Sequence, residues 1–459
     1  MAHFDLLIIG GGSGNSILSP DFDDWNVALV ERGPLGGTCL NVGCIPSKML
    51  ILPADRVVES SEAASIGVEI TDVKADWPAI RDRVFGRIDP IVEDGTRYRQ
   101  SQPNVTYYAG DARFTGDRRI TIQLNSGGSE EVSADHVVLA AGARPFIPAI
   151  AGLLSTPFQT SDTIMRIDRV PDRLAILGGG FIAAELGHVF AAMGSKVTVI
   201  QRGERMLRPE DDEISQRFTD VFADRVDLRL NSHPTRVQHS DGVFTIEVEN
   251  SAGDTDVVVA DEFLITTGRQ PNGDQLNVAA TGVEMDSDGY VITDPELRTS
   301  APNVWALGDI RNPLQLKHLA NLEARVVSHN LAHPEDLIAI DERVVPHGIF
   351  SHPQIGSAGL RERELIASGR EYLVGRCDYG GVAYGWALED TTGFAKILID
   401  AKTKEILGIH VIGPQATTLM QQVVQAMTFG IPADRLVHEQ IWCHPALPEL
   451  IENAILDAL

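Results

Sequence analysis

Two cysteines lie five residues apart in the segment 36–48, which reads GGTCLNVGCIPSK. The chain has only four cysteines in 459 residues, so a framework of structural disulfides is excluded and a close pair is more typical of catalysis or metal binding. In a regular helix, residues five apart have Cα atoms about 8 to 9 Å apart, whereas disulfide-bonded Cα atoms lie within about 7 Å. A bond between Cys39 and Cys44 therefore needs an irregular backbone, which Gly43 is well placed to supply.

A helix that begins near Cys44 would make this pair reactive. Pro46 is tolerated in the first turn of a helix, and a helix N-terminus stabilises a thiolate and lowers the pKa of a cysteine. Lys48 follows Cys44 by four residues and would share its helical face. Cys377 and Cys443 have no such context and are expected to be packing residues.

A histidine and a glutamate near the C-terminus could serve such a thiol pair as acid and base. The segment HPALPE places His444 near Glu449, with two prolines that stiffen the connection. A carboxylate bonded to an imidazole raises the basicity of the ring and fixes its tautomer, as a general base for a thiol requires.

The elements that must position these groups begin with a strand and a glycine loop. Phe4–Ile9 is apolar and leads directly into GGGSGN, in which Gly10 and Gly12 would let a pyrophosphate approach the N-terminus of a following helix. Asn15 holds the third glycine slot and should loosen the packing of that helix slightly. Val27–Glu31 then ends in a carboxylate suited to ribose hydroxyls, so the pattern predicts a dinucleotide site.

A second unit repeats strand, glycine loop and helix. Leu174–Leu177 leads into GGGFIAAE, where Gly178 and Gly180 occupy the phosphate-facing positions and Ala183 fills the third slot. This segment predicts a second dinucleotide site.

The second site should prefer NADPH. Its next strand, Lys196–Ile200, ends at Gln201 and Arg202 instead of an acid, and Arg208 follows. A ribose that carries only hydroxyls favours a carboxylate, whereas a 2′-phosphate favours arginine. The alternative is that both arginines are ordinary surface charges.

Two further segments fit nucleotide binding. Phe263–Arg269 is expected to be a strand returning to the core, and Val304–Asp309 places an acid after a strand, where it could bind polyol hydroxyls. Two glycine loops and a cysteine pair together suggest electron flow from a pyridine nucleotide through a flavin to a disulfide.

The length and net charge of the chain limit its number of domains and its classes of partner. The length suggests roughly three domains, and 38 Lys and Arg against 64 Asp and Glu give a net charge of −26, which disfavours nucleic acid and anionic lipid as partners. The sequence has no membrane span or signal-peptide pattern, so we expect a cytoplasmic protein. Asp21, Asp23 and Asp24 are expected to be solvated, and no metal site is predicted.

GGTCLNVGCIPSK, the two glycine loops, TTGRQPN, ALGD and HPALPE together resemble the flavoprotein disulfide reductases. The resemblance covers nearly the whole chain. It implies an α/β fold with two Rossmann-like dinucleotide-binding domains, for FAD and NADPH, and an α+β C-terminal dimerisation domain in a homodimer. The implied segments are 1–148 and 272–342 for FAD, 149–271 for NADPH and 343–459 for the interface.

The resemblance also implies residue roles. Cys44 would face the flavin and Cys39 would attack the substrate disulfide. The remaining catalytic residues would be His444 and Glu449, which serve the opposite subunit, and Lys48 near the flavin, paired with Glu185. Cofactor contacts would come from Gly10, Gly12, Ser13, Gly14, Glu31, Thr38, Lys48, Ala112, Arg269, Asp309, Gly178, Gly180, Ile182, Arg202, Arg208 and Gly268.

Departures from other family members indicate the substrate. Ile17 and Pro20 occupy helix positions where glutathione reductase carries an arginine for its anionic substrate. An uncharged wall suits an uncharged pseudodisaccharide disulfide such as mycothione. The alternatives are lipoamide dehydrogenase, a glutathione-type disulfide reductase and, from another class, a flavin-binding interaction protein without turnover.

Overall fold

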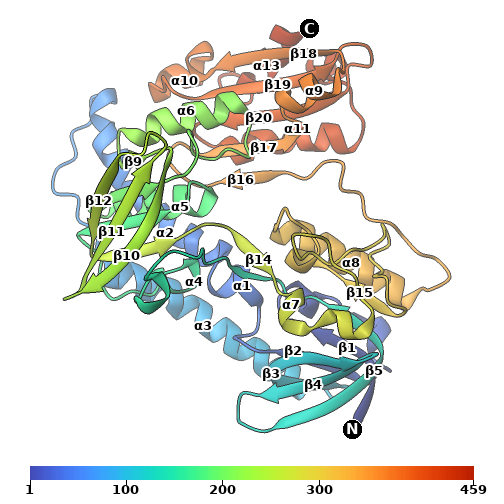
Figure 1. The fold of residues 1–459 in the computed structure, drawn as a ribbon. Helices are drawn as coiled ribbons and strands as arrows, with labels where there is room; N and C mark the ends of the chain where they lie inside the picture. The colour runs from blue at the N-terminus through green and yellow to red at the C-terminus, as the bar shows by residue number, and fades with distance from the viewer. The chain divides into compact units, whose positions relative to one another are not determined.

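The computed structural model describes all 459 residues, and the chain divides into two compact units (Figure 1). Unit 1 contains residues 1–46, 82–146 and 268–341, and unit 2 contains residues 47–81, 147–267 and 342–459. The unit boundaries near residues 146, 267 and 341 lie close to those predicted between cofactor domains. Residues 47–81, however, belong to unit 2, so the predicted division into four segments stays a prediction.

Unit 1 is built on a six-stranded sheet in which two long strands each have parallel neighbours over one half and an antiparallel neighbour over the other. The N-terminal half of β3 pairs with β2 in parallel, and its C-terminal half pairs with β4 in antiparallel. β5 likewise pairs with β4 and then with β1 and β15. The strands of unit 1 are β1 (Ala2–Ile9), β2 (Val27–Glu31), β3 (Val105–Gly116), β4 (Arg119–Leu124), β5 (Ser129–Leu139), β6 (Ala143–Pro145), β14 (Arg269–Pro271) and β15 (Val304–Ala306).

β1 is buried on both faces, as its apolar sequence requires. Leu7 and Ile9 belong to one hydrophobic core, and Leu6 and Ile8 belong to another on the opposite face. The helices of unit 1 are α1 (Gly37–Asn41), most of α3 (Trp77–Ser101), α7 (Gly273–Leu276) and α8 (Lys317–Ala332).

The α-helix expected after the first glycine loop is absent, which corrects the sequence prediction. Only a 3₁₀ turn, Ser13–Ser16, follows the loop, and a second one begins at Pro20. Ser19 is extended, with φ −111° and ψ 175°, because a residue before proline avoids the helical region. Ile17 is fully buried in the core, so it cannot form the wall of a substrate site.

Unit 2 contains the second glycine loop and two further sheets. β13, β7, β8 and β9 form a parallel sheet, and β10, β11 and β12 form an antiparallel sheet. The strand predicted over Phe263–Arg269 ends at Ile265, and Gly268 turns the chain with φ 106° before β14 begins at Arg269. These strands are β7 (Arg173–Leu177), β8 (Lys196–Ile200), β9 (Asp227–Arg229), β10 (Ser232–Ser240), β11 (Val243–Asn250), β12 (Thr255–Ala260) and β13 (Glu262–Ile265).

The C-terminal part of unit 2 is a five-stranded antiparallel sheet. β19 and β20 are buried along their whole length, with α11 packed on β17 and β20 and α13 packed on β18 and β19. The strands are β16 (His347–Ile349), β17 (Ile355–Gly359), β18 (Tyr372–Asp378), β19 (Phe394–Asp400) and β20 (Ile406–Ile412). The helices of unit 2 are α2 (Cys44–Glu62, starting in unit 1), α4 (Ser161–Ile164), α5 (Phe181–Ala192), α6 (Asp212–Ala223), α9 (Glu362–Ser368), α10 (Ala383–Leu388), α11 (Ala416–Thr428), α12 (Ala433–Glu439) and α13 (Glu449–Ala458).

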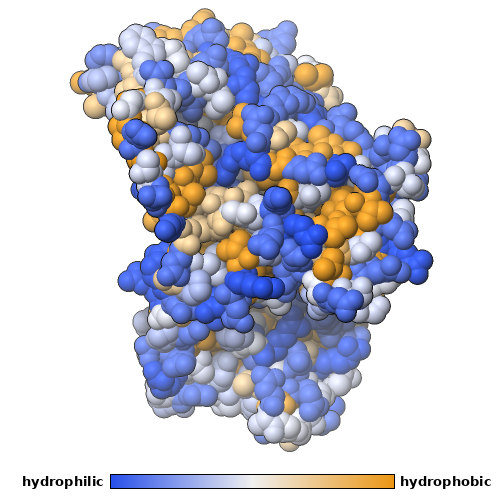
Figure 2. All heavy atoms as spheres, turned by 90° about the vertical axis from the view of Figure 1, so that its left-hand side faces the viewer, coloured by the Kyte–Doolittle hydropathy of each residue, from blue (hydrophilic) through white to orange (hydrophobic).

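Hydrophobic and hydrophilic side chains alternate over the surface shown in Figure 2, where hydrophobic areas are separated by hydrophilic ones. Phe429 and Ile441 are among the most exposed apolar side chains of unit 2, at 74% and 97%. No helix has the length and apolar character that crossing a membrane requires. The fold is the predicted α/β arrangement. One glycine loop follows β1 of a mixed sheet, a second follows β7 of a parallel sheet, and the C-terminal region is α+β.

Candidate active site

The two cysteines lie on consecutive helices that a short break separates. Cys39 is in α1, and Cys44 is the first residue of α2. Between them, Val42 has φ −144° and ψ 19°, so the irregular backbone that a bond between the cysteines requires is present. Cys39 is partly buried and Cys44 is exposed. The helix start predicted at Cys44 is confirmed, and the redox role of the pair stays a prediction.

Gly43 permits this break through its lack of a side chain and not through a left-handed conformation. A Cβ atom at Gly43 would lie 2.9 Å from the carbonyl oxygen of Thr38. From Cys44, α2 then runs for 19 residues. Its first N–H groups carry the positive end of the helix dipole, which favours a thiolate at Cys44.

The first glycine loop holds a carboxylate at the end of the parallel sheet. Gly10 has φ 111°, and a Cβ atom there would lie 2.2 Å from the carbonyl oxygen of Ala140, so the turn requires glycine. Glu31 accepts hydrogen bonds from the N–H groups of Gly11 at 2.7 Å and Gly33 at 2.8 Å. This is the edge of the sheet where nucleotides bind in such folds.

The same loop is in backbone contact with the start of α1. A Cβ atom at Gly37 would lie 2.7 Å from Cα of Gly12, and the N–H of Gly36 donates to the carbonyl oxygen of Gly11 at 3.0 Å. Gly14 packs tightly on Ile8 and Ala140. The loop and the helix that carries Cys39 are therefore held together.

Arg269 and Asp309 lie on the same side of unit 1 as Thr38. Arg269 Nη2 donates to Thr38 Oγ1 at 3.5 Å and to the carbonyl oxygen of Ala143. Burial raises the pKa of Asp309, and the charge of Arg269 opposes that rise. No side chain donates a hydrogen bond to Asp309, so its oxygens are available to polyol hydroxyls.

Three other predicted cofactor residues offer little side-chain chemistry. Ala112 places its methyl group in the hydrophobic core, and Gly268 accepts a hydrogen bond from the N–H of Phe146 at 2.9 Å. Ile182 is the second residue of α5 and is partly buried. Ala112 and Gly268 can contact a cofactor only through their backbone atoms.

A lysine beside the first loop was missed by sequence reasoning. Lys317 is the first residue of α8, and its Nζ donates to Ser13 Oγ at 2.8 Å. Ser13 in turn donates to Asn321 Oδ1 at 3.3 Å. Burial lowers the pKa of Lys317, and negative charge at Cys39, Cys44 and Asp309 would oppose that change. A lysine at a helix start carries no sequence signal that distinguishes it from a surface residue.

Asn15, which replaces the third glycine, has a structural role that differs from the expected loosening of a helix. Its side-chain oxygen accepts a hydrogen bond from Arg99 Nε at 2.6 Å, and its carbonyl oxygen accepts one from Arg99 Nη2 at 2.7 Å. Burial lowers the pKa of Arg99. Asn15 therefore ties the 3₁₀ turn to α3.

The second glycine loop is covered by the segment that follows β8. Gly178 has φ 114°, and Gly180 caps the N-terminus of α5. The side chain of Gln201 lies against Gly179, and the N–H of Leu207 donates to the Gly179 carbonyl oxygen at 2.7 Å. Residues 201–208, called the arginine loop below, therefore fold onto the glycine loop.

Two arginines of the arginine loop have no partner within the protein. Arg202 and Arg208 are exposed and make no hydrogen bond or ion pair. Arg205 differs, because its Nη2 pairs with Asp212 Oδ1 at 3.3 Å. The side chain of Arg208 packs against Gly203, so both free guanidinium groups are available to an anionic ligand.

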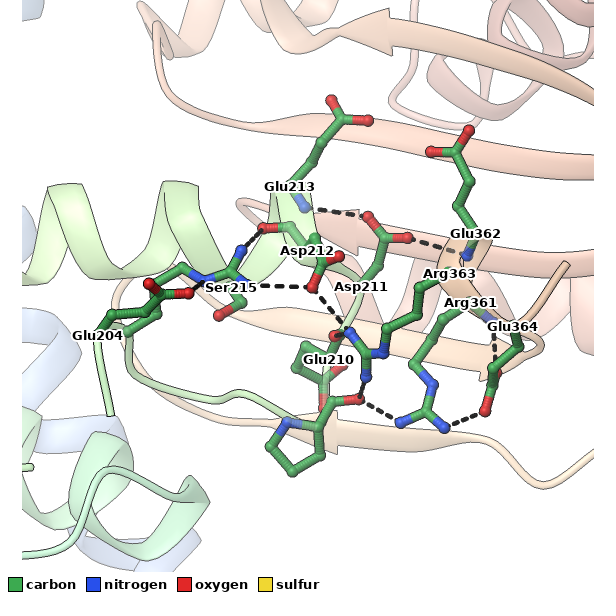
Figure 3. Close-up of polar contacts among 12 residues, drawn as sticks. Glu204, Glu210, Asp211, Asp212, Glu213, Ser215, Arg361, Glu362, Arg363 and Glu364 are labelled. Carbon is green, nitrogen blue, oxygen red and sulfur yellow. Dashed lines mark hydrogen bonds and ion pairs between the residues drawn. The ribbon is translucent and has the colours of Figure 1, made fainter. Parts of the chain in front are cut away.

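The arginine loop is anchored where it enters α6 (Figure 3). Arg361 and Arg363 both donate to the carbonyl oxygen of Pro209, at 2.6 and 2.8 Å, and Arg363 also bonds the carbonyl oxygen of Glu210 and Asp212 Oδ1. The carboxylate of Glu210 is bonded to His347 and Ser357, at 2.7 and 2.8 Å. Side chains of the C-terminal region thus fix the backbone next to Arg208.

Lys48 and Glu185 form an ion pair inside unit 2. Lys48 Nζ lies 2.7 and 2.8 Å from the two carboxylate oxygens of Glu185, whose side chain is only 6% exposed. The N–H of Phe350 donates to the same carboxylate at 3.0 Å, and the ring of Phe350 lies under the ammonium group.

His444 and Glu449 are also in contact. His444 Nδ1 lies 2.7 Å from Glu449 Oε1, and this hydrogen bond lowers the pKa of Glu449. The His444 side chain is 70% exposed, and Glu449 contacts only its Nδ1 atom. Cys443 is exposed, which contradicts its expected role in packing, whereas Cys377 packs partly against the C-terminal core.

Comparison with known proteins identifies the family. Residues 4–324 match the model of the pyridine nucleotide-disulphide oxidoreductases, and residues 345–455 match the dimerisation domain of the same family. The chain belongs to this family. As such it is an NADPH-dependent disulfide oxidoreductase that carries FAD, as the resemblance predicted, and its dimerisation domain supports a homodimer.

Curated members of this oxidoreductase family are similar over most of their length. The chain is 42% identical to the mycothione reductase of Mycobacterium tuberculosis over 99% of both chains. It is 29% identical to a mercuric reductase of Staphylococcus aureus, over 94% of this chain and 78% of that protein. The HOCl-induced flavoprotein disulfide reductase RclA of Escherichia coli superposes with a TM-score of 0.85 at 26% identity, over 98% of this chain and 99% of RclA.

Proposed function

We propose that this oxidoreductase uses NADPH to reduce mycothiol disulfide, mycothione, through a disulfide between Cys39 and Cys44. The observation that carries the disulfide chemistry is the break between α1 and α2, with one cysteine on each side of it. The choice of mycothione is supported by the 42% identity to a mycothione reductase over nearly the whole chain. Because Ile17 is buried, it cannot line the substrate site, and an uncharged wall at this position no longer supports the choice of mycothione.

The residues of unit 1 fit FAD. Glu31 would accept from the adenosine ribose, the backbone of residues 10–14 would face the pyrophosphate, and Asp309 would bind the polyol. FAD held by these residues would supply the two-electron chemistry that links hydride donation by NADPH to reduction of the disulfide. Further contacts would come from Thr38, Lys48, Ala112 and Arg269.

The cysteines would then carry the two electrons to the substrate. The Cys39 thiolate attacks one sulfur of mycothione, forming a mixed disulfide, and the first mycothiol leaves. His444 of the partner subunit protonates that leaving thiolate, and Glu449 of the partner subunit orients the imidazole. Cys44 attacks the mixed disulfide at Cys39, which releases the second mycothiol and restores the Cys39–Cys44 disulfide.

The NADPH site would lie at the second glycine loop, between residues 149 and 271. Gly178, Gly180, Ile182 and Gly268 would border the nucleotide, and Arg202 and Arg208 would bind its 2′-phosphate. The absence of an acid at Gln201 and the lack of other partners for both arginines support this assignment. The FAD segments 1–148 and 272–342 and the interface segment 343–459 complete the proposed division.

A comparison of substrates tests the proposal. Steady-state NADPH oxidation with mycothione, glutathione disulfide and lipoamide should give the highest kcat/KM with mycothione. A higher kcat/KM with either of the others would refute the proposed substrate and leave the family unchanged. Lipoamide dehydrogenase, the main alternative, would in addition favour NAD over NADP, which Arg202 and Arg208 disfavour.

A further inference from the structure

The first glycine loop lacks the long helix that follows such a loop in a regular dinucleotide-binding unit. Only the 3₁₀ turn Ser13–Ser16 follows it, with four residues. The N-terminus of a regular helix carries about half an elementary positive charge, which favours a pyrophosphate at the loop. A turn of four residues cannot align enough peptide dipoles to supply that charge. A pyrophosphate at residues 10–14 therefore needs another source of positive charge.

Lys317 brings an ammonium group to this turn. It is the first residue of α8, and its Nζ donates a hydrogen bond to Ser13 Oγ at 2.8 Å. The side chain is partly buried, and no carboxylate forms an ion pair with it. Taking an ammonium group out of water costs free energy unless a negative charge compensates it. Two of its three N–H groups remain available to an anion at the loop.

Hydrogen bonds hold both the ammonium group and the turn in place. Ser13 Oγ donates to Asn321 Oδ1 at 3.3 Å, and Asn321 lies one helical turn after Lys317 on the same face of α8. The other end of the turn is held by Arg99, which donates to the side-chain and backbone oxygens of Asn15 at 2.6 and 2.7 Å. The buried Arg99 also lacks a carboxylate partner. Two cations from distant helices therefore flank one short turn.

The nearest carboxylates do not pair with Lys317. Glu31 accepts hydrogen bonds from the N–H groups of Gly11 and Gly33, at the start of the loop. Burial raises the pKa of Asp309, and the charge of Arg269 has a larger opposing effect than that of Lys317. A diphosphate at the loop would give the Lys317 ammonium group the anionic partner that these carboxylates do not provide.

We propose that Lys317 pairs with the pyrophosphate of FAD and supplies the positive charge that the missing helix does not. This inference deepens the proposed function and rests on the FAD site proposed at residues 10–14. No covalent bond forms or breaks in this pairing. Ser13 and Asn321 position the ammonium group before the cofactor binds, which reduces the entropy lost on binding.

The affinity for FAD tests this pairing. The FAD-loaded enzyme is diluted, and the rise in flavin fluorescence on release gives the Kd. Lys317→Met removes a charge-assisted bond, so the Kd should rise about tenfold to a hundredfold. Lys317→Arg keeps the charge, and its Kd should stay within about threefold of that of the unmodified enzyme. Lys74→Met removes an exposed lysine, controls for net charge and should leave the Kd unchanged.

Stability toward urea separates this pairing from a purely structural role. In the flavin-free protein, Lys317→Met removes a partly buried cation without a carboxylate partner, so the free energy of unfolding should stay the same or rise. Saturating FAD should then stabilise Lys317→Met less than it stabilises the unmodified enzyme. A lysine that only held Ser13 in place would lower the stability of the flavin-free protein when removed, which would contradict the proposal.

Two further results would overturn the proposal. One is a Kd for FAD in Lys317→Met within about twofold of that of the unmodified enzyme. The other needs no variant and applies even if Lys317→Met fails to fold: FAD should slow the acetylation of Lys317 by acetic anhydride but not that of Lys74, as peptide mass spectrometry resolves. Equal acetylation of Lys317 with and without FAD would exclude the pairing. None of these measurements requires turnover, so their failure would leave the proposed reduction of mycothione intact.

Discussion

Lys48 Nζ contacts both carboxylate oxygens of Glu185, a residue 137 positions away in the sequence, and Glu185 is almost fully buried. Lys48 lies one turn after Cys44 on α2, and Glu185 lies in the first turns of α5, which follows the second glycine loop. The ion pair therefore joins the helix that starts at a proposed redox cysteine to the helix that starts at the proposed NADPH site.

Removing the cation of this pair should destabilise the protein more than removing both charges. Lys48→Met leaves the Glu185 carboxylate buried with one backbone donor, at a cost of about 2 to 4 kcal/mol in the free energy of unfolding. The double variant Lys48→Met/Glu185→Gln should recover part of that loss, as measured by urea unfolding. A double variant less stable than Lys48→Met would contradict this account.

The two unpartnered arginines should determine nucleotide preference. Arg202→Gln and Arg208→Gln each remove a charge-assisted bond to the 2′-phosphate, so the KM for NADPH should rise about tenfold while that for NADH changes less than about twofold. Arg435→Gln removes an exposed arginine of the same unit, paired only with Glu439, and is the matched control. Equal changes in both KM values would show that neither arginine recognises the phosphate.

Arg361 and Arg363, which hold the backbone at the end of the arginine loop, should affect NADPH binding only by positioning that loop. Arg363→Met removes hydrogen bonds to the carbonyl oxygens of Pro209 and Glu210, so the KM for NADPH should rise about threefold to tenfold with kcat changed less than about twofold. Arg370→Met, which breaks ion pairs with Asp400 and Glu405, is the control. A fall in kcat without a change in KM would contradict a positioning role.

The contribution of Asp211 to stability should depend on pH. Burial alone would raise the pKa of Asp211, but the charges of His410 and Lys396 and its hydrogen bonds lower it below the usual range. A lowered carboxyl pKa stabilises the fold above the unfolded value of about 4, and this stabilisation is lost as pH falls through the folded pKa. The difference in unfolding free energy between the unmodified protein and Asp211→Asn should therefore be largest at pH 7 and should decrease below about pH 4. A difference in unfolding free energy that does not change with pH would contradict a stabilising role of the ionised Asp211 carboxylate.

Much of the scaffold could be predicted because hydrophobic pattern and glycine spacing are local signals. β2 and β8 have the predicted bounds, and α2 begins at Cys44. The helix expected after the first glycine loop was wrong, because Pro20 and extended Ser19 outweigh the loop pattern. The proline that prevents this helix could therefore have been recognised in the sequence.

Other features depend on contacts between distant segments and had no local signal. Lys317 reaches Ser13 across 304 positions, and Arg99 reaches Asn15 across 84. The pairing of Lys48 with Glu185 came only from the family resemblance. Likewise, the exposure of Cys443 reflects how the turn before α13 lies on the surface, which its neighbours in the sequence do not determine.

The most direct test of the central claim is the redox state of the peptide that contains Cys39 and Cys44. Before NADPH is added to the FAD-loaded enzyme, neither cysteine should react with iodoacetamide under denaturing conditions. After one equivalent of NADPH under anaerobic conditions both should react, and excess mycothione should then abolish the reaction. Alkylation of both cysteines that is the same before and after NADPH would contradict the account.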